Sequence, residues 1–422
     1  MTIGDKKIVK LYAGKEISAA YVGDKNVFQN YYGVSFPLTG PADTRLTRIG
    51  YMPWHRELPI QSNMKTCTVT ENGTVKYLNA TDRTKYEDGT ARDMSLDTMV
   101  EIPQFWYKCM HDDTNVYLML YPSKPNIPDV VEVKKFYMGA YEGVVKDNKL
   151  MSINDGVSVP TVTTTRTTFQ QKATAKGSGW SAYTYKAHIA LTILYLVEYA
   201  CSNSQLAFNS ALTAEGYKQG GLGAGVTGGS VTKNGVTAYS FVPCGTTDSL
   251  GNGTGIVSFR FTNTDAEGNE TSTTTKEVPS YRGIENPFGH VWKNCVDILI
   301  HYNAETTNND VYTCTSDKYT STNINDYAFT CSTSTREGYK KKLIYDSMFN
   351  LFPPTDETFG ANTTTYWCDY NYSNTSTTDR TLLIGGCSGD GGVAGLLALY
   401  SYYALGYSSA TVGTRNLYVP QA

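Results

Sequence analysis

Hydrophobic and polar positions along the chain predict many short strands and two helices. From residue 45 to about 150, short apolar and aromatic stretches such as Met99–Lys108 predict short strands that alternate with turns. Helices are predicted over Thr167–Lys176 and over about Ser181–Cys201. Apolar residues cover much of the circumference of the second helix, which therefore should be buried. From residue 216 onward, Gly, Thr and Asn dominate and predict short strands joined by long ordered loops.

The first 33 residues contain a short repeat in which Gly-Asp-Lys or Gly-Lys separates β-branched and aromatic residues, at residues 4–8, 12–17 and 21–27. This pattern predicts tight β-hairpins. Because so small a sheet is not stable alone, we interpret residues 1–33 as a β attachment module. A homotrimer formed through it would supply the missing partners. Residues 34–44, which include Phe36–Pro41, are predicted to be a linker, and residues 45–422 the main domain.

Composition and charge exclude some classes of function. The 422 residues carry a net charge of -3 and only 18% charged side chains, without the basic stripe that nucleic-acid binding requires. The 33 tyrosines and many threonines favour strands, and a surface poor in Lys and Glu suits an extracellular protein. The N-terminus resembles no secretory signal and no stretch is long enough to span a membrane. Synthesis in a cytoplasm followed by life outside the cell is typical of virion components.

The chain offers few residues in catalytic or metal-binding patterns. Nine cysteines contain no CxxC pair, so we expect them to be reduced and buried, with a Cys314–Cys331 disulfide as the alternative. Residues 223–228 match GxGxxG, but a strand rather than a helix is predicted after them, which argues against a nucleotide site. The five histidines form no HExxH motif, and GxSxG is absent. We therefore predict no catalytic residue, metal or cofactor.

Tyr281–Trp292 combines charged, amide and aromatic side chains with Gly and Pro turns. This composition predicts a buried polar network that shapes irregular loops, with Arg282 and Glu285 as a desolvated pair. The residues predicted to be structural are Arg282, Glu285, Asn286, Trp292 and Arg415.

Residues 382–415 are the strongest candidate for a recognition surface. Between Gly385 and Thr414, Asp390 is the one charged residue in a framework of Gly, Ser, Tyr and small apolar residues. Tyr provides contact area at low entropic cost, while Ser and Gly adapt to a ligand; a buried C-terminal β-hairpin is the alternative. The predicted ligand-binding residues are Ser388, Asp390, Val393, Leu397, Leu399, Tyr400, Ser401, Tyr402, Tyr403, Leu405, Tyr407 and Ser408, with an aromatic rim of Tyr366, Trp367, Tyr370 and Tyr372.

Several blocks of this sequence together resemble phage tail proteins that have a C-type lectin fold of the formylglycine-generating-enzyme type. The blocks are Leu58–Lys65, Met99–Pro103, Gly139–Gly143, Leu194–Tyr199 and Tyr281–Trp292, and the resemblance covers about residues 45–419. The C-terminal pattern GG…G…AGL…VGxR resembles the variable region of proteins diversified by retroelements. Departures from that pattern are Cys387-Ser388, where family members often have Trp, and Thr411–Arg415.

The resemblance implies an α+β fold in which the small N-terminal β module precedes a C-type lectin-type domain with two main helices. It also implies a tail protein, placed in the virion at the tail tip or fibre, that binds a host bacterial surface receptor, protein or glycan, and contacts other tail proteins through its N-terminal module. Oxidase activity is not implied, because Cys368 and Cys387 lie nineteen positions apart (387 − 368) whereas formylglycine-generating enzymes use a close pair. The alternatives are a structural tail or baseplate subunit and a surface-glycan hydrolase.

Overall fold

The computed structural model of the protein describes residues 2–3, 6–7, 19–22, 25–316, 318–357 and 359–421. Strands make up 37% of the residues and helices 11%, so the fold is rich in strands, as the sequence pattern predicts. Within these described ranges, no helix is long and apolar enough to cross a membrane. The described residues form three α-helices: α1 (Met52–Glu57), α2 (Arg166–Thr174) and α3 (Tyr185–Tyr199).

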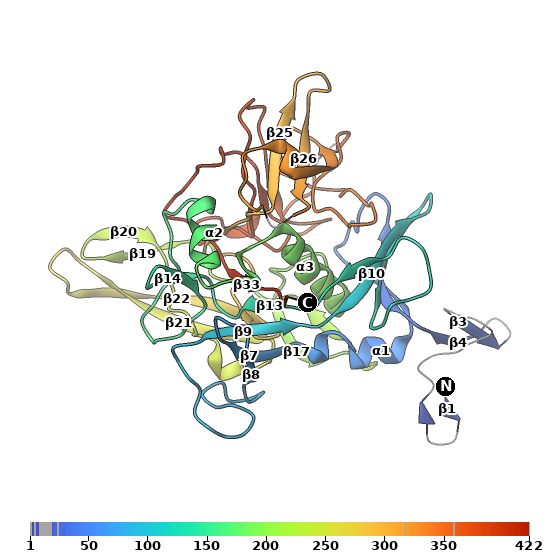
Figure 1. Ribbon diagram of the computed structural model, residues 1–422, viewed down its shortest axis with the longest axis horizontal. Helices are drawn as coiled ribbons and strands as arrows, with labels where there is room; N and C mark the ends of the chain where they lie inside the picture. The colour runs from blue at the N-terminus through green and yellow to red at the C-terminus, as the bar shows by residue number, and fades with distance from the viewer. Residues whose placement is uncertain are drawn as a thin grey trace.

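Helix α3 runs through the middle of the protein (Figure 1). The Thr184 side chain accepts a hydrogen bond from the backbone N–H of Ala187 (3.1 Å) and begins the helix, while Ala200 ends it in the left-handed conformation. Every residue of α3 except Lys186 is buried, because the helix is apolar on all sides and is surrounded by other elements. It starts four residues later than predicted, since Trp180–Ala182 forms strand β16 instead.

Two sheets flank this helix, and a third carries the C-terminal region. The first has the order β12 (Val131–Val133), β10 (Phe105–His111), β11 (Asn115–Tyr121), β5 (Tyr32–Pro37), β6 (Thr47–Gly50). The second has the order β16, β33 (Asn416–Tyr418), β13 (Phe136–Gly139), β9 (Asp97–Ile102), β7 (Lys65–Val69), β8 (Val75–Tyr77). The third has the order β28 (Gly338–Tyr339), β29 (Tyr370–Tyr372), β31 (Leu399–Tyr400), β30 (Leu383–Ile384), β24 (Trp292–Asn294), β32 (Val412–Gly413).

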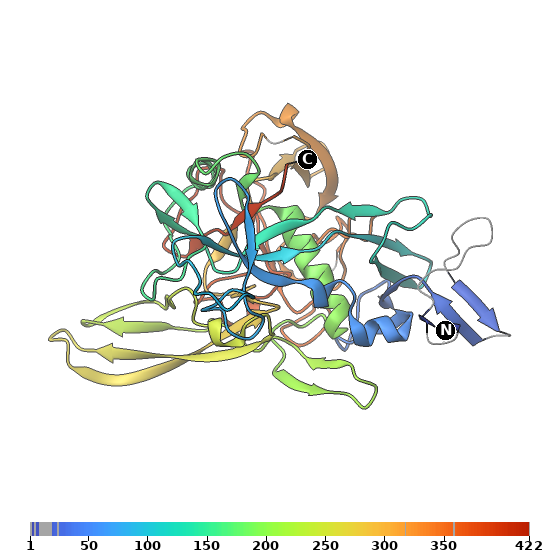
Figure 2. The ribbon, with the colours of Figure 1, turned by 60° about the horizontal axis from the view of Figure 1, so that its bottom comes forward.

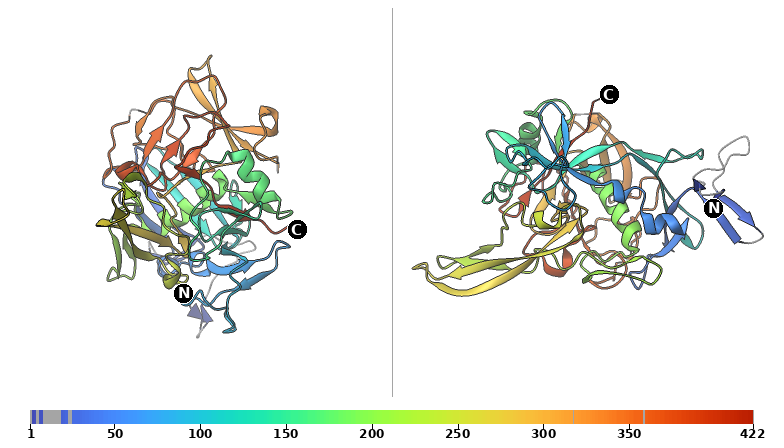
Figure 3. Two further views of the ribbon diagram at one scale, coloured as in Figure 1. Left: turned by 90° about the vertical axis from the view of Figure 1, so that its left-hand side faces the viewer. Right: turned by 90° about the horizontal axis from the view of Figure 1, so that it is seen from below.

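Smaller sheets complete the fold and include two projecting arms. The arms are the hairpins β19–β20 (Ser230–Lys233, Val236–Tyr239) and β21–β22 (Gly255–Thr264, Glu270–Tyr281), and β23 (Ile284–Glu285) continues the second. Figures 2 and 3 show them extending from the body on the side opposite the N-terminal hairpins. The remaining strands are β14–β15 (Val144–Lys146, Lys149–Met151), β17–β18 (Phe208–Leu212, Lys218–Gly220) and β25–β26–β27 (Ile298–Asn303, Asn308–Cys314, Tyr327–Thr333).

The N-terminal region differs from the predicted division into module and linker. Strand pairs β1–β2 (Thr2–Ile3, Lys6–Lys7) and β3–β4 (Ala19–Val22, Lys25–Gln29) are antiparallel, as the turn pattern predicts. The repeat at residues 12–17 lies outside the described residues. Residues 34–37 are no linker, because they form most of β5 between β11 and β6. Tyr32, Val34 and Phe36 point into the core on alternate positions, so the main domain already includes them.

All nine cysteines lie in the described part of the chain, and each is buried and free of a disulfide. The prediction of reduced, buried thiols is confirmed, and the alternative of a Cys314–Cys331 bridge is wrong. Both residues instead sit in neighbouring strands of the β25–β26–β27 sheet, where they behave as small apolar side chains.

Candidate ligand-binding site

The C-terminal sheet places tyrosines on its outer surface by strand alternation. Strands β29 and β31 run parallel, with Asn371 opposite Leu399 and Tyr372 opposite Tyr400. Asn371 and Leu399 are buried, whereas Tyr372 and Tyr400 are partly exposed. Because successive side chains of a strand point to opposite faces, the same two-residue alternation puts Asn371 and Leu399 inward and the two tyrosines outward.

Seven partly exposed tyrosines form one continuous surface, which we call the tyrosine face. Its members are Tyr339, Tyr370, Tyr372, Tyr400, Tyr402, Tyr403 and Tyr407. Ring centroids of consecutive members are 5.0 Å apart for Tyr339–Tyr370, 4.4 Å for Tyr370–Tyr372, 4.5 Å for Tyr372–Tyr400, 5.3 Å for Tyr400–Tyr403 and 3.6 Å for Tyr403–Tyr407. Tyr402 is 44% exposed and lies beside Tyr403, at 5.4 Å.

Burial keeps the hydroxyl groups of Tyr370, Tyr372, Tyr400 and Tyr407 neutral at physiological pH. Burial raises the pKa of Tyr372 to about 12 and also raises the pKa of Tyr370, Tyr400 and Tyr407. A protonated tyrosine hydroxyl both donates and accepts a hydrogen bond. The face therefore offers a ligand aromatic area together with neutral hydrogen-bonding groups.

Side chains from elsewhere in the fold hold the backbone of residues 391–402 in place. The Nε2–H of His188 donates to the Leu396 carbonyl (2.5 Å), and the Asp369 carboxylate accepts from the Leu397 N–H (2.7 Å). Further contacts of this kind come from Gln205 to the carbonyls of Gly391 and Ala394, from Ser204 to the N–H of Leu396, from Lys340 to the carbonyl of Leu397, and from Arg380 and Asn374 to the carbonyls of Ser401 and Tyr402. None of these bonds involves a side chain of the segment itself.

Five of the predicted ligand-binding residues are buried and belong to the core. Leu397, Leu399, Trp367 and Ser388 have no exposed surface, and Ser401 is 3% exposed. Leu397 and Leu399 pack with Trp367 in the main hydrophobic cluster. They cannot touch a ligand bound to this fold, so their predicted role is corrected to packing.

The other predicted residues keep some exposure but do not all join the face. Asp390, Val393, Leu405, Ser408 and Tyr366 are partly exposed. Leu405 packs against the cluster around Leu299. The Tyr366 ring instead lies 5.6 Å from the Lys341 Nζ, away from the contiguous rings.

The sequence did not predict that two further tyrosines lie at this site. Tyr339 belongs to the face although it precedes the predicted region by more than forty residues. Tyr239, 43% exposed on the β19–β20 arm, reaches the loop at Gly389, where a Cβ would lie 2.6 Å from its ring. No local pattern marks either residue, because strand pairing and an arm from another sheet bring them there.

The residues predicted to be structural are buried or nearly so, with different partners from those expected. Arg282 pairs with Glu198 rather than with Glu285, through Nη2–Oε1 (2.6 Å) and Nε–Oε2 (3.1 Å). Glu285 accepts hydrogen bonds from the Gly245 N–H (3.0 Å) and from the N–H and hydroxyl of Thr247 (2.7 and 2.9 Å). Burial raises the pKa of Glu285 to about 7 despite these bonds.

Arg415 holds the backbone of Glu285 and Asn286, whereas Trp292 packs against the tyrosine face. The Arg415 guanidinium donates to the carbonyls of Glu285 (2.6 Å) and Asn286 (3.1 Å). The Trp292 ring, 4% exposed, lies 5.3 Å from the ring of Tyr400. The buried Trp292 ring therefore packs against Tyr400 from the interior side.

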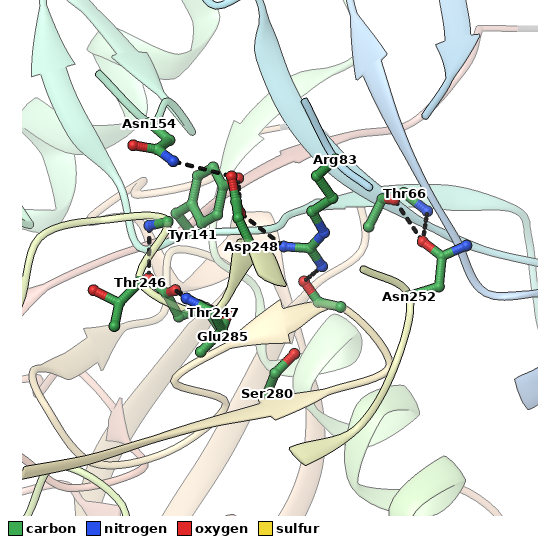
Figure 4. Close-up of polar contacts among 12 residues, drawn as sticks. Thr66, Arg83, Tyr141, Asn154, Thr246, Thr247, Asp248, Asn252, Ser280 and Glu285 are labelled. Atoms are coloured by element: carbon green, nitrogen blue, oxygen red, sulfur yellow. Dashed lines mark hydrogen bonds and ion pairs between the residues drawn. The ribbon is translucent and has the colours of Figure 1, made fainter. Parts of the chain in front are cut away.

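A second polar cluster surrounds Asp248 (Figure 4). Its carboxylate receives hydrogen bonds from Arg83 (3.2 Å), Arg92 (3.3 Å), Tyr141 (2.5 Å) and Asn154 (2.9 Å). The two arginines are almost fully buried, whereas Asp248 is 17% exposed. With its oxygens accepting from four donors, this carboxylate joins distant segments of the chain.

Comparisons with known proteins find a solved structure of low similarity and no matching family. A scan against models of protein families finds no match, and no curated protein matches. Among solved structures, the chain is similar to "Major Tropism Determinant U1 Variant", with 13% identity, a TM-score of 0.27, and coverage of 84% of this chain and 72% of that chain. A TM-score this low establishes neither a shared fold nor a shared function.

Proposed function

We propose that the protein is a phage tail adhesin that binds a host-cell surface receptor through the tyrosine face. The observation that carries the proposal is the face itself: seven contiguous, partly exposed tyrosines on a backbone held by side chains from outside the segment. Aromatic residues dominate the energetics of protein interfaces, and a rigid, aromatic surface loses little entropy on binding. In this proposal the main domain is a C-type lectin-type scaffold, and the protein resides in the virion.

The proposal gives the protein no catalytic role. Glu285, which is buried, and Asp248, which is 17% exposed, both accept hydrogen bonds from donors of the fold. A structural tail subunit remains the second candidate, and it makes a different prediction for Tyr402. In an adhesin this side chain stays exposed in the assembled particle, whereas in a structural subunit a neighbouring subunit covers it.

Binding of the labelled full-length chain to a panel of bacterial strains tests the proposal. On a strain that binds the native chain, Tyr402→Ala combined with Tyr403→Ala should reduce binding at least tenfold, since hot-spot residues cost about 2 kcal/mol or more each. Tyr117→Ala is the matched control, because Tyr117 is also partly exposed but lies on β11 of the first sheet. Equal binding by a folded double variant and the native chain would refute the assignment.

A further inference from the structure

The charged groups around the tyrosine face are arranged by sign. Glu337 precedes β28, and its carboxylate accepts a hydrogen bond from the N–H of Ser373 (3.1 Å), the residue that follows Tyr372 on β29. Its negative charge contributes, after burial, to the raised pKa of Tyr370 and acts on Tyr372 as well. The exposed Glu337 carboxylate is therefore held at the edge of the rings.

A second carboxylate lies on a loop that is paired with the backbone of residues 403–404. Asp379, whose side chain is 27% exposed, stands in the loop that runs beside residues 402–404. That loop is joined to them by the N–H of Thr381, which donates to the Tyr403 carbonyl (3.0 Å), and by a bridge between Arg380 and Ala404. Asp379 also contacts His301 at 2.8 Å.

Positive groups in the same region are turned inward or toward other rings. The side chains of Lys340 and Arg380 are fully buried and are hydrogen-bonded to backbone carbonyls. Arg336 is exposed, but its guanidinium lies 5.7 Å from the centre of the Phe359 ring. Lys341 is directed at Tyr366. Among the described residues near the face, three carboxylates thus keep some exposure: Glu337 and Asp390, whose charges act on Tyr372, and Asp379, which is paired with His301.

We infer that the tyrosine face takes a protein receptor whose contacting loop carries arginine or lysine side chains. The inference rests on the proposed function and specifies its partner. Tyrosine rings attract cations through their π-electrons, and a guanidinium pairs with a carboxylate while it stacks on an aromatic ring. Tyrosine rings bordered by carboxylates match such a surface, whereas an anionic polysaccharide would meet like charges.

Charge-reversal variants test the inference on a strain that binds the native chain. Glu337→Lys combined with Asp379→Lys should lower the association rate about tenfold at low salt, because rim charges steer encounter. With Glu337→Gln combined with Asp379→Asn, binding should fall less steeply with increasing salt than it does for the native chain. The control, Glu267→Lys, makes the same change at an exposed position on the β21–β22 arm. Circular dichroism and thermal unfolding identify any variant that fails to fold.

Treatment of the cells identifies the class of receptor. Digestion with a broad-specificity protease should abolish binding, whereas periodate oxidation of glycans should leave it intact. Unchanged or stronger binding by the charge-reversed chain, or binding that survives proteolysis, would overturn the inference. The two proposals can fail separately. If the Tyr402, Tyr403 double variant loses binding while the charge-reversed chain binds normally, the adhesin function is preserved and only the cationic partner is refuted.

Discussion

The buried ammonium group of Lys340 is the most direct point at which to test how the C-terminal loops are held. Its Nζ donates to the carbonyls of Leu351 (3.3 Å) and Leu397. Asp369, also buried, accepts from the Leu397 N–H. Burial lowers the pKa of Lys340 and raises that of Asp369, and each charge partly offsets the shift of the other. Lys340→Met removes the cation and both of its hydrogen bonds.

The expected cost is large because a buried carboxylate remains behind. Leaving a buried carboxylate without the cation that compensates it typically costs about 3–5 kcal/mol. Without Lys340, the pKa of Asp369 should rise further. A carboxyl group whose folded pKa exceeds its unfolded pKa loses stability as pH rises through the folded value. The penalty of Lys340→Met should therefore be smaller at about pH 5 than at about pH 8.

Urea unfolding followed by intrinsic fluorescence at the two pH values measures this penalty. Lys340→Met combined with Asp369→Asn is the control, because it removes both ionisable groups and should abolish the extra pH dependence of the single variant. A penalty below about 1 kcal/mol, or one that is the same at both pH values, would show that the two groups are not coupled in the core.

Three other predictions concern the same region. Burial lowers the pKa of His188 to about 4, so this residue should reduce stability by roughly 3 kcal/mol as pH drops from about 6.5 toward 4; in unfolding measured across this range, the stability difference between the native chain and His188→Asn should change by that amount, and a constant difference would contradict the prediction. Gly386→Ala should destabilise the fold by about 1–3 kcal/mol, since φ is +85° and the new Cβ would lie 2.4 Å from another side chain; a thermal midpoint equal to that of the native chain would contradict this. Leu397→Ala should cost about 2–5 kcal/mol and Tyr402→Ala less than about 0.5 kcal/mol in urea unfolding, and the reverse order would mean that Leu397 is the surface residue.

Local sequence patterns predicted those features of the fold that depend on residues close together in the chain. The apolar circumference of α3 predicts both the helix and its burial, and the Gly-Asp-Lys turn predicts the hairpin of β3 and β4. The absence of CxxC pairs predicts isolated, reduced cysteines. In each case the relevant interactions lie within a few residues of one another along the chain.

Long-range pairing explains what the sequence did not reveal. Arg282 has an acidic residue three positions away, but its partner is Glu198, eighty-four positions upstream. Within the candidate site, strands of only two or three residues carry too little alternation to show that Leu399 points inward and Tyr400 outward. Tyr339 joins the face because β28 pairs with β29, and no residue near it in the sequence indicates that pairing.

The main-chain anchoring of residues 391–402 has a consequence for the kinetics of binding. Because the loop is ordered before it meets a partner, a receptor does not have to select a rare conformation or wait for the loop to fold. Encounter should therefore proceed at similar rates for chains that differ in the exposed side chains of this segment. Differences in affinity among such chains should appear in how long each complex lasts, so that dissociation rates span a wide range while association rates cluster together.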